Sequence, residues 1–150
     1  MYVNDNVDAV HALDTGTGET IWSVEVGYAS GGSPSRSAEG LIMPAGGALS
    51  PALAVQDHGD RGELVWQDPD LLNRGIATQA GGSIAYVTVA RQGPENDLVV
   101  LDTATGEVLD RHELPGVSGF SVGTTVGPDG TVLVPTIRGQ LHAFVPAGGG

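Results

Sequence analysis

Residues 12–22, ALDTGTGETIW, are the stretch that decides the fold, because their pattern returns twice further along the chain. Residues 61–66 read RGELVW, and residues 101–110 read LDTATGEVLD. The Gly-Glu pair begins at residues 18, 62 and 106, so both intervals are 44 residues. The two tryptophans, Trp22 and Trp66, keep the same interval. A fixed period of this length is the signature of a repeat architecture.

Short apolar and β-branched runs fill the rest of each period. They lie at residues 41–43, 84–89 and 131–134, and each follows a glycine-containing turn signal. Four short strands in about 44 residues are typical of a β-propeller blade. The sequence therefore predicts an all-β fold, an incomplete β-propeller of roughly three four-stranded blades. No stretch predicts an amphipathic helix, and residues 68–73 are expected to form one turn at most.

The repeat also predicts the domain boundaries. We expect a part-blade at 1–27, blades at 28–69 and 70–114, a part-blade at 115–146 and a flexible tail at 147–150. Closed propellers have typically about 4 to 8 blades, so the ring is expected to be open. Missing blades elsewhere in a parent protein, or a second copy in a homodimer, would complete it.

Composition excludes several classes of function. The formal net charge is −12 and the pI is about 4.3, so nucleic acid and anionic membrane surfaces are disfavoured as partners. With no cysteine there is no disulfide, no thiolate metal site and no cysteine nucleophile. No window reaches the roughly 18 apolar residues of a membrane span, and residues 1–6 lack a signal-peptide pattern.

The first copy of the pattern resembles the tryptophan-docking motif of the PQQ-like, or quinoprotein-like, β-propeller repeats. That resemblance implies that the tryptophan packs between adjacent blades, while the aspartate and the Thr-Gly turn hold the last hairpin. The third copy departs from the motif, since it has Asp110 in the tryptophan position. The residues assigned to this structural repeat motif are Ala12, Asp14, Thr17, Gly18, Trp22, Asp57, Gly62, Trp66, Asp102, Thr105 and Gly106.

The resemblance implies two alternative functions. One is a non-catalytic module that serves as a scaffold for protein or ligand binding, with no cofactor and no catalytic residues. The other is a fragment of a PQQ-dependent dehydrogenase, which would use PQQ with calcium and would be expected to carry adjacent cysteines. Their absence favours the scaffold. Relatives of this kind work mostly outside the cytoplasm, so a periplasmic or extracellular location is implied for a parent protein.

Three further patterns are interpreted as structural. Residues 119–123, GFSVG, match a nucleophile motif with Asp129 and His142 in triad order, but that motif requires a helix where this chain predicts strands. The acidic stretch at residues 4–8 lacks the glycine and distal glutamate of a calcium loop and favours a hairpin loop. The stretch at residues 57–60 is interpreted as the loop between the last two strands of a blade. The four histidines show no metal-ligand spacing, so no metal site is predicted.

Overall fold

The structure is a computed structural model that describes residues 1–30, 32–47, 50–91, 95–120 and 123–146. These residues form an all-β fold of fourteen strands. The strands are β1 (Tyr2–Asn4), β2 (Ala9–Leu13), β3 (Thr20–Glu25), β4 (Ser35–Arg36), β5 (Leu41–Met43), β6 (Pro51–Asp57), β7 (Gly62–Leu72), β8 (Thr78–Ala80), β9 (Ile84–Ala90), β10 (Asn96–Asp102), β11 (Val108–Leu114), β12 (Thr125–Val126), β13 (Val132–Pro135) and β14 (Leu141–Phe144). Within the described ranges, no helix is long and apolar enough to cross a membrane.

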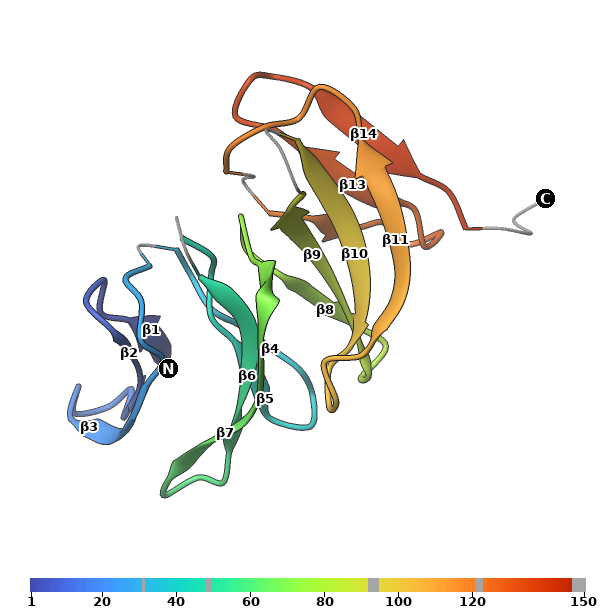
Figure 1. The fold of residues 1–150 in the computed structure, drawn as a ribbon. Helices are drawn as coiled ribbons and strands as arrows, with labels where there is room; N and C mark the ends of the chain where they lie inside the picture. Colours follow the sequence, from blue (N-terminus) through green and yellow to red (C-terminus); the bar gives the residue numbers. More distant parts are fainter. Residues whose placement is uncertain (31, 48–49, 92–94, 121–122, 147–150) are drawn as a thin grey trace.

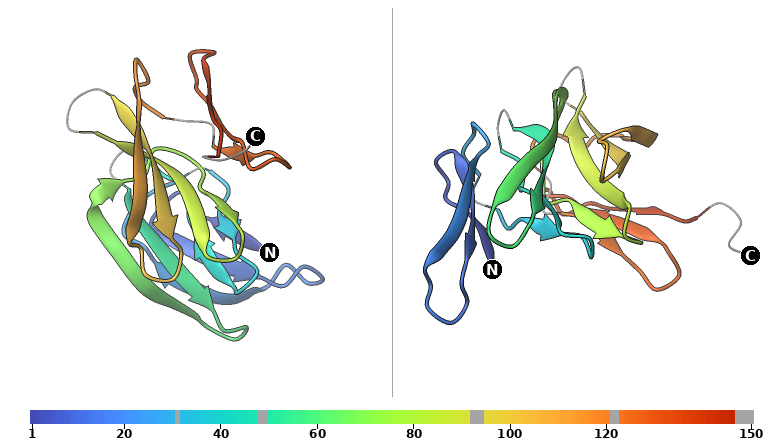
Figure 2. Two further views of the ribbon diagram at one scale, coloured as in Figure 1. Left: turned by 90° about the vertical axis from the view of Figure 1, so that its right-hand side faces the viewer. Right: turned by 90° about the horizontal axis from the view of Figure 1, so that it is seen from below.

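The strands form four antiparallel sheets in which each strand pairs with its neighbour in sequence. The first sheet contains β1–β3, the second β4–β7, the third β8–β11 and the fourth β12–β14. Figure 1 shows the sheets side by side in chain order, and Figure 2 shows that they do not close into a ring. The described part of the chain is therefore an open propeller with two four-stranded blades between two three-stranded part-blades.

Burial along the strands shows which sheets have neighbours on both faces. Four consecutive residues of β6, 52–55, are all buried, and so are the first four residues of β10. A strand covered on only one face alternates between buried and exposed residues, as β3 does around Trp22 and as β14 does between exposed and half-buried positions. In the two middle sheets, β6 and β10 are thus covered on both faces, whereas their outer strands β7 and β11 are largely exposed. In the first and fourth sheets, β3 and β14 are covered on one face at most.

The core is divided among the three interfaces between sheets. Val10, Trp22 and Ile42 belong to the cluster between the first and second sheets. The cluster between the second and third sheets includes Met43, Ala52, Ala54, Val87 and Val89. A smaller cluster of Leu98, Leu114, Val117, Val132 and Val134 joins the third and fourth sheets. Each blade is therefore stabilised by its immediate neighbours, as in other repeat proteins.

The observed strands correct the sequence prediction at one place. Residues 68–73 were expected to form one helical turn at most, and residues 68–72 belong instead to β7, which is 11 residues long. Pairing shifts between Pro51, opposite Leu72, and Ala52, opposite Asp68, so the extra residues form a bulge. Residues 70–72 of β7 lie beyond residue 69, the expected end of this blade. The tail at 147–150 lies outside the described residues.

Candidate functional site

The turn between the last two strands has the same geometry in the first and third sheets. The Oδ1 atom of Asp14 accepts hydrogen bonds from the backbone N–H groups of Gly16 and Thr17, both at 2.8 Å. Asp102 accepts the equivalent pair from Ala104 and Thr105, both at 2.9 Å. The closing glycines adopt positive φ, 78° at Gly18 and 76° at Gly106. Such a conformation is strained for any residue with a Cβ atom.

The second sheet closes the same hairpin with one more residue. Asp57 accepts the N–H of Gly59 at 2.8 Å, and Gly59 takes the positive φ, 93°. The N–H of His58 then donates to the carbonyl of Arg61 at 3.0 Å. Gly62 is thereby placed at the start of β7 rather than at the turn. Of the three glycines spaced by 44 residues, Gly62 and Gly106 lie in an interface against an indole, whereas Gly18 has no atom within 4 Å of its Cβ position. Only Gly18 and Gly106 adopt the positive φ that closes the turn.

The first interface between sheets holds a buried indole. Trp22 on β3 donates its Nε1–H to the Oδ1 atom of Asp57 at 3.0 Å. A Cβ atom added to Gly62 would lie 2.7 Å from the Cε3 atom of Trp22, so the ring rests directly on the glycine backbone. The Tyr2 ring lies 5.9 Å from the indole, and its hydroxyl donates to the other oxygen of Asp57. A buried indole needs such an N–H partner.

The second interface repeats this docking with a different acceptor. Trp66 on β7 is half-buried and donates its Nε1–H to the carbonyl of Thr103 at 2.8 Å. A Cβ atom on Gly106 would lie 2.7 Å from the Cδ2 atom of Trp66. The Oδ1 atom of Asp102 already accepts two backbone N–H groups and the hydroxyl of Thr105. In both interfaces the indole lies against the glycine of the following motif copy.

The aspartates of the motif have lowered pKa values. Burial acts to raise the pKa of Asp57, but hydrogen bonds from Tyr2, Gly59 and Trp22 together with the charge of Arg36 outweigh it, so the pKa lies below its ordinary value. Backbone hydrogen bonds within the turn are the main cause of the lowered pKa values of Asp14 and Asp102. For Tyr2, burial and the neighbouring Asp57 raise the pKa. The motif carboxylates are thus stabilised in the ionised form.

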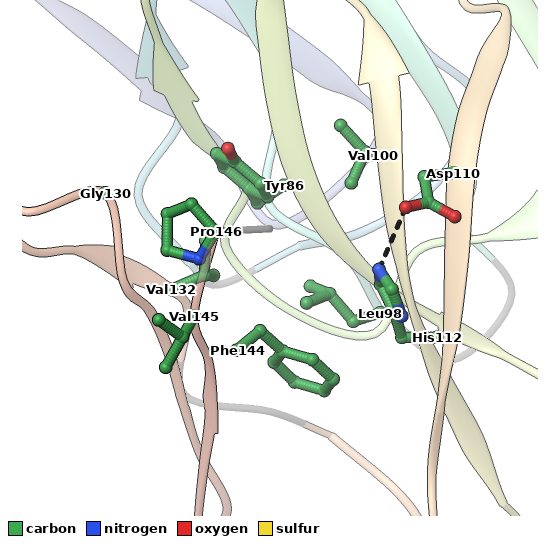
Figure 3. Close-up of a pocket in the computed structure, with 10 residues that line it drawn as sticks. All are labelled: Tyr86, Leu98, Val100, Asp110, His112, Gly130, Val132, Phe144, Val145 and Pro146. Atoms are coloured by element: carbon green, nitrogen blue, oxygen red, sulfur yellow. Dashed lines mark ion pairs between the residues drawn. The ribbon is translucent and has the colours of Figure 1, made fainter. Parts of the chain in front are cut away.

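The third interface contains a cavity instead of an indole. Asp110 on β11 occupies the position of the missing third tryptophan, and it pairs with His112 at 3.0 Å. The cavity measures about 270 Å³, and Figure 3 shows side chains of the third and fourth sheets facing each other across it. Its lining residues are Tyr86, Leu98, Val100, Asp110, His112, Gly130, Val132, Phe144, Val145 and Pro146. The rings of His112 and Phe144 are 5.2 Å apart.

Sequence reasoning missed the two tyrosines of these interfaces and the cavity. Tyr2 and Tyr86 reach their positions through cross-strand register, which the spacing along the chain does not reveal. The replacement of tryptophan by Asp110 was the available signal for the cavity, since a small polar residue cannot fill the space of an indole.

The acidic stretch at residues 4–8 and the described part of the triad-like pattern are structural. The Oδ1 atom of Asp5 accepts backbone N–H groups from Val7, Asp8 and Ala9, which stabilises the β1–β2 loop and lowers the pKa of Asp5. Asp129 accepts the N–H of Thr131 in the β12–β13 turn. Ser121 lies outside the described residues. Within the described ranges, no three histidine, aspartate or glutamate side chains gather closely enough to hold a metal ion.

Comparisons with known proteins agree with this architecture. Residues 1–121 match the family model described as "Outer membrane protein assembly factor BamB". "Protein Rv3035" of Mycobacterium tuberculosis (strain ATCC 25618 / H37Rv) is 32% identical over 152 residues, which cover 97% of this chain and 36% of that protein. The crystal structure of BamB from Moraxella catarrhalis has a TM-score of 0.72 at 17% identity and covers 95% of this chain and 45% of that chain.

This chain therefore spans less than half the length of either relative. The likeness to the crystal structure shows the propeller fold. Together with the family match over residues 1–121, it shows that the chain belongs to the family of PQQ-like β-propeller repeats described as outer membrane protein assembly factor BamB.

Proposed function

We propose that this chain is a non-catalytic propeller module that serves as a scaffold for protein binding in a periplasmic or extracellular compartment. The description of its family as an assembly factor supports a role in holding proteins together. The fold supports it too, since a propeller presents loops of variable sequence on a rigid framework. The residues that bind a partner then belong to loops at one end of the blades rather than to the docking motif, which is occupied with internal contacts.

One loop cluster carries exposed apolar side chains suited to this role. Phe120 follows β11 and Ile137 lies between β13 and β14, and both are exposed. The loops meet, because a Cβ atom on Gly119 would lie 3.9 Å from the Cδ1 atom of Ile137. The guanidinium of Arg74 lies 5.8 Å from the centroid of the Phe120 ring. We call Arg74, Phe120 and Ile137 the rim patch; Arg74 lies between β7 and β8, so three segments contribute to it.

The rim patch is the observation that carries the proposal. Aromatic residues and arginine are enriched at the energetic centres of protein interfaces, and neighbouring exposed apolar side chains on a soluble surface mark interaction sites. A hydrogen bond holds the loop that bears Phe120 in place: the side-chain amide of Asn96 donates to the carbonyl of Gly119 at 2.7 Å. A fixed loop loses less conformational entropy on binding than a mobile one.

The dehydrogenase alternative lacks a comparable observation. PQQ held by calcium needs oxygen ligands that converge on the ion. The described residues bring no such group of carboxylates together. These residues do not fit the cofactor, and we derive no reaction step through it.

Site-specific photocrosslinking in the full-length protein tests the scaffold proposal. A photoreactive phenylalanine analogue at Phe120 or Ile137 should give a discrete crosslinked protein product. The same analogue at Val7, which is at least as exposed as either rim residue but lies on the β1–β2 loop, is the control. Equal labelling at Val7, or no product at either rim position, would contradict the proposal. Stoichiometric PQQ binding with calcium, accompanied by dye reduction, would replace it with the dehydrogenase alternative.

A further inference from the structure

Two rows of paired residues show what the third interface lacks. In the first sheet, Tyr2 pairs with Ala12, and Ala12 pairs with Trp22 on the next strand. In the third sheet, Tyr86 pairs with Val100, and Val100 pairs with Asp110. Residues paired directly across antiparallel strands point to the same face. The two rows are therefore equivalent, with a tyrosine at one end and either an indole or a carboxylate at the other.

The cavity of the third interface lies where this row faces the fourth sheet. Tyr86, Val100 and Asp110 all line it. In the first interface the Tyr2 ring flanks the indole of Trp22 at 5.9 Å. A ring placed in the cavity would meet Tyr86 in the same way, with Phe144 and Val132 as apolar walls from the fourth sheet (Figure 3). The third interface therefore retains the tyrosine and the apolar walls of a ring site without supplying the ring from its own strand. The counterpart of Gly62 and Gly106, residue 150, lies outside the described residues.

Asp110 gives the cavity a hydrogen-bond acceptor. An ionised carboxylate has about four acceptor positions on its two oxygens. Asp110 uses one of these positions for His112 at 3.0 Å and one for the backbone N–H of Arg111 at 2.8 Å. It therefore keeps acceptor capacity for a group in the cavity. The docked indoles of the first two interfaces each donate their N–H to an oxygen, of Asp57 and of Thr103. Both of those acceptors belong to the sheet that follows the tryptophan, whereas Asp110 lies at the tryptophan position itself. The third interface thus offers an apolar ring site whose oxygen acceptor is on β11, and a bound indole would direct its N–H toward that strand.

We propose that this cavity binds the tryptophan side chain of a protein partner, whose indole occupies the place that Trp22 and Trp66 fill in the other two interfaces. The identity of the occupant as a protein rests on the scaffold function proposed above. The choice of an indole rests on the equivalent rows and on the acceptor. The rim patch and the cavity are separate contact points, because no rim-patch residue lines the cavity.

An NMR titration with N-acetyl-tryptophanamide tests the ring site without a known partner. The probe should cause saturable shifts of the Tyr86, His112 and Phe144 signals. N-acetyl-phenylalaninamide, which has a ring but no indole N–H, should bind several-fold more weakly, since it cannot donate a hydrogen bond to the partly exposed carboxylate of Asp110. Shifts that do not saturate, or that map to another part of the molecule, contradict the proposal.

Two substitutions at one position connect the binding to the cavity. Asp110→Trp supplies the missing indole from β11 itself, so the affinity for N-acetyl-tryptophanamide should fall at least about tenfold. Leu109→Trp is the matched control, because Leu109 is the exposed neighbour on the same strand and does not line the cavity. Undiminished binding by a folded Asp110→Trp variant overturns the proposal. Asp110→Ala keeps the apolar walls but removes the acceptor, so the preference for the tryptophan amide should disappear.

The crosslinking and probe-binding experiments together distinguish a failure of the indole site from a failure of the scaffold function. Rim-patch crosslinks without probe binding leave the scaffold intact and reject the indole site. Probe binding at the cavity without any crosslinked protein supports the ring site and rejects a protein as its occupant. A peptide with one tryptophan, derived from any crosslinked partner, should compete with N-acetyl-tryptophanamide. The same peptide with tryptophan replaced by alanine should not.

Discussion

The indole N–H of Trp22 donates to the carboxylate of Asp57 at 3.0 Å, across the interface between the first and second sheets. The same carboxylate accepts the hydroxyl of Tyr2 and the backbone N–H of Gly59. One side chain therefore fixes the turn of its own hairpin and two aromatic residues of the preceding sheet. The motif aspartate of the second sheet acts between blades, whereas Asp14 and Asp102 bond within their own turns.

Replacing Asp57 should weaken the first interface as a whole. In Asp57→Ala the buried N–H of Trp22 loses its acceptor, and an unsatisfied buried donor costs about 1 to 3 kcal/mol. We expect a loss of about 2 to 3 kcal/mol in the free energy of unfolding, measured by urea denaturation. Asp60→Ala in the same loop removes only an exposed ion pair with Arg61 and should change the stability by less than about 0.5 kcal/mol. Equal effects of the two variants would show that the interface bond is unimportant.

The lowered pKa of Asp57 predicts a dependence of stability on pH. A carboxyl whose pKa is lower in the folded than in the unfolded chain stabilises the fold above the unfolded value, near 3.8, and this contribution is lost as the pH falls through the folded pKa. The denaturation midpoint should therefore fall steeply below about pH 4. Asp57→Asn should flatten this decline, while Asp60→Asn should retain the slope of the parent chain. Parallel pH curves for the parent and Asp57→Asn would refute the assignment.

Truncating the docked tryptophans should reveal their unequal burial. Trp22 is buried, so Trp22→Ala should cost about 3 to 5 kcal/mol. Trp66 is half-buried, and Trp66→Ala should lie at the lower end of that range. Leu64→Ala, at an exposed position on the same strand as Trp66, is the control and should cost little. Losses of less than about 1 kcal/mol for both tryptophans in denaturant melts would remove the basis for the docking assignment.

Alanine substitutions at the three glycines of the repeat distinguish the cost of a positive φ from the cost of a clash with an indole. In Gly18→Ala the added methyl group has no atom within 4 Å, so only the positive φ destabilises the variant, by roughly 1 kcal/mol in the free energy of unfolding. Gly62→Ala has no positive φ but would place a methyl group 2.7 Å from Trp22. Gly106→Ala combines both effects against Trp66. Thermal melts should therefore rank the destabilisation as Gly106 above Gly62 above Gly18. A larger effect at Gly18 than at Gly62 would mean that the indole moves away without cost.

The repeat could be predicted from the sequence because its positions recur at fixed intervals. The runs at 41–43 and 84–89 coincide with β5 and most of β9, since β-branched residues next to glycine turns carry a local signal. The segment at 68–72 could not be predicted, because a bulge depends on the register opposite Pro51. The sequence also did not reveal which group accepts the N–H of each indole. The acceptor is a carboxylate oxygen of Asp57 in the first interface and the backbone carbonyl oxygen of Thr103 in the second. Only the structure shows which oxygen faces each indole.

The last prediction concerns the uncovered faces of the first and fourth sheets. Leu141 on β14 is exposed, whereas residues 52–55 of β6 and 96–99 of β10 in the middle sheets are buried. Ile21 on β3 is exposed as well. Burying such faces against each other is favourable at about 25 cal/mol per Å² of apolar area. The isolated chain should therefore associate, and its melting temperature should rise with protein concentration.

Sedimentation velocity over a wide concentration range measures this association directly. Ile21→Gln and Leu141→Gln should each reduce it. Val65→Gln is the control, because Val65 is also exposed but lies on β7 of the second sheet, which packs against a neighbouring sheet on each side. A pair of copies that completes a ring should give a defined dimer, whereas open-ended pairing through strand edges should give a broad series of larger species. A soluble monomer with a concentration-independent melting temperature and terminal strands protected from hydrogen exchange would contradict both modes of association. It would also show that the uncovered faces are stable in water.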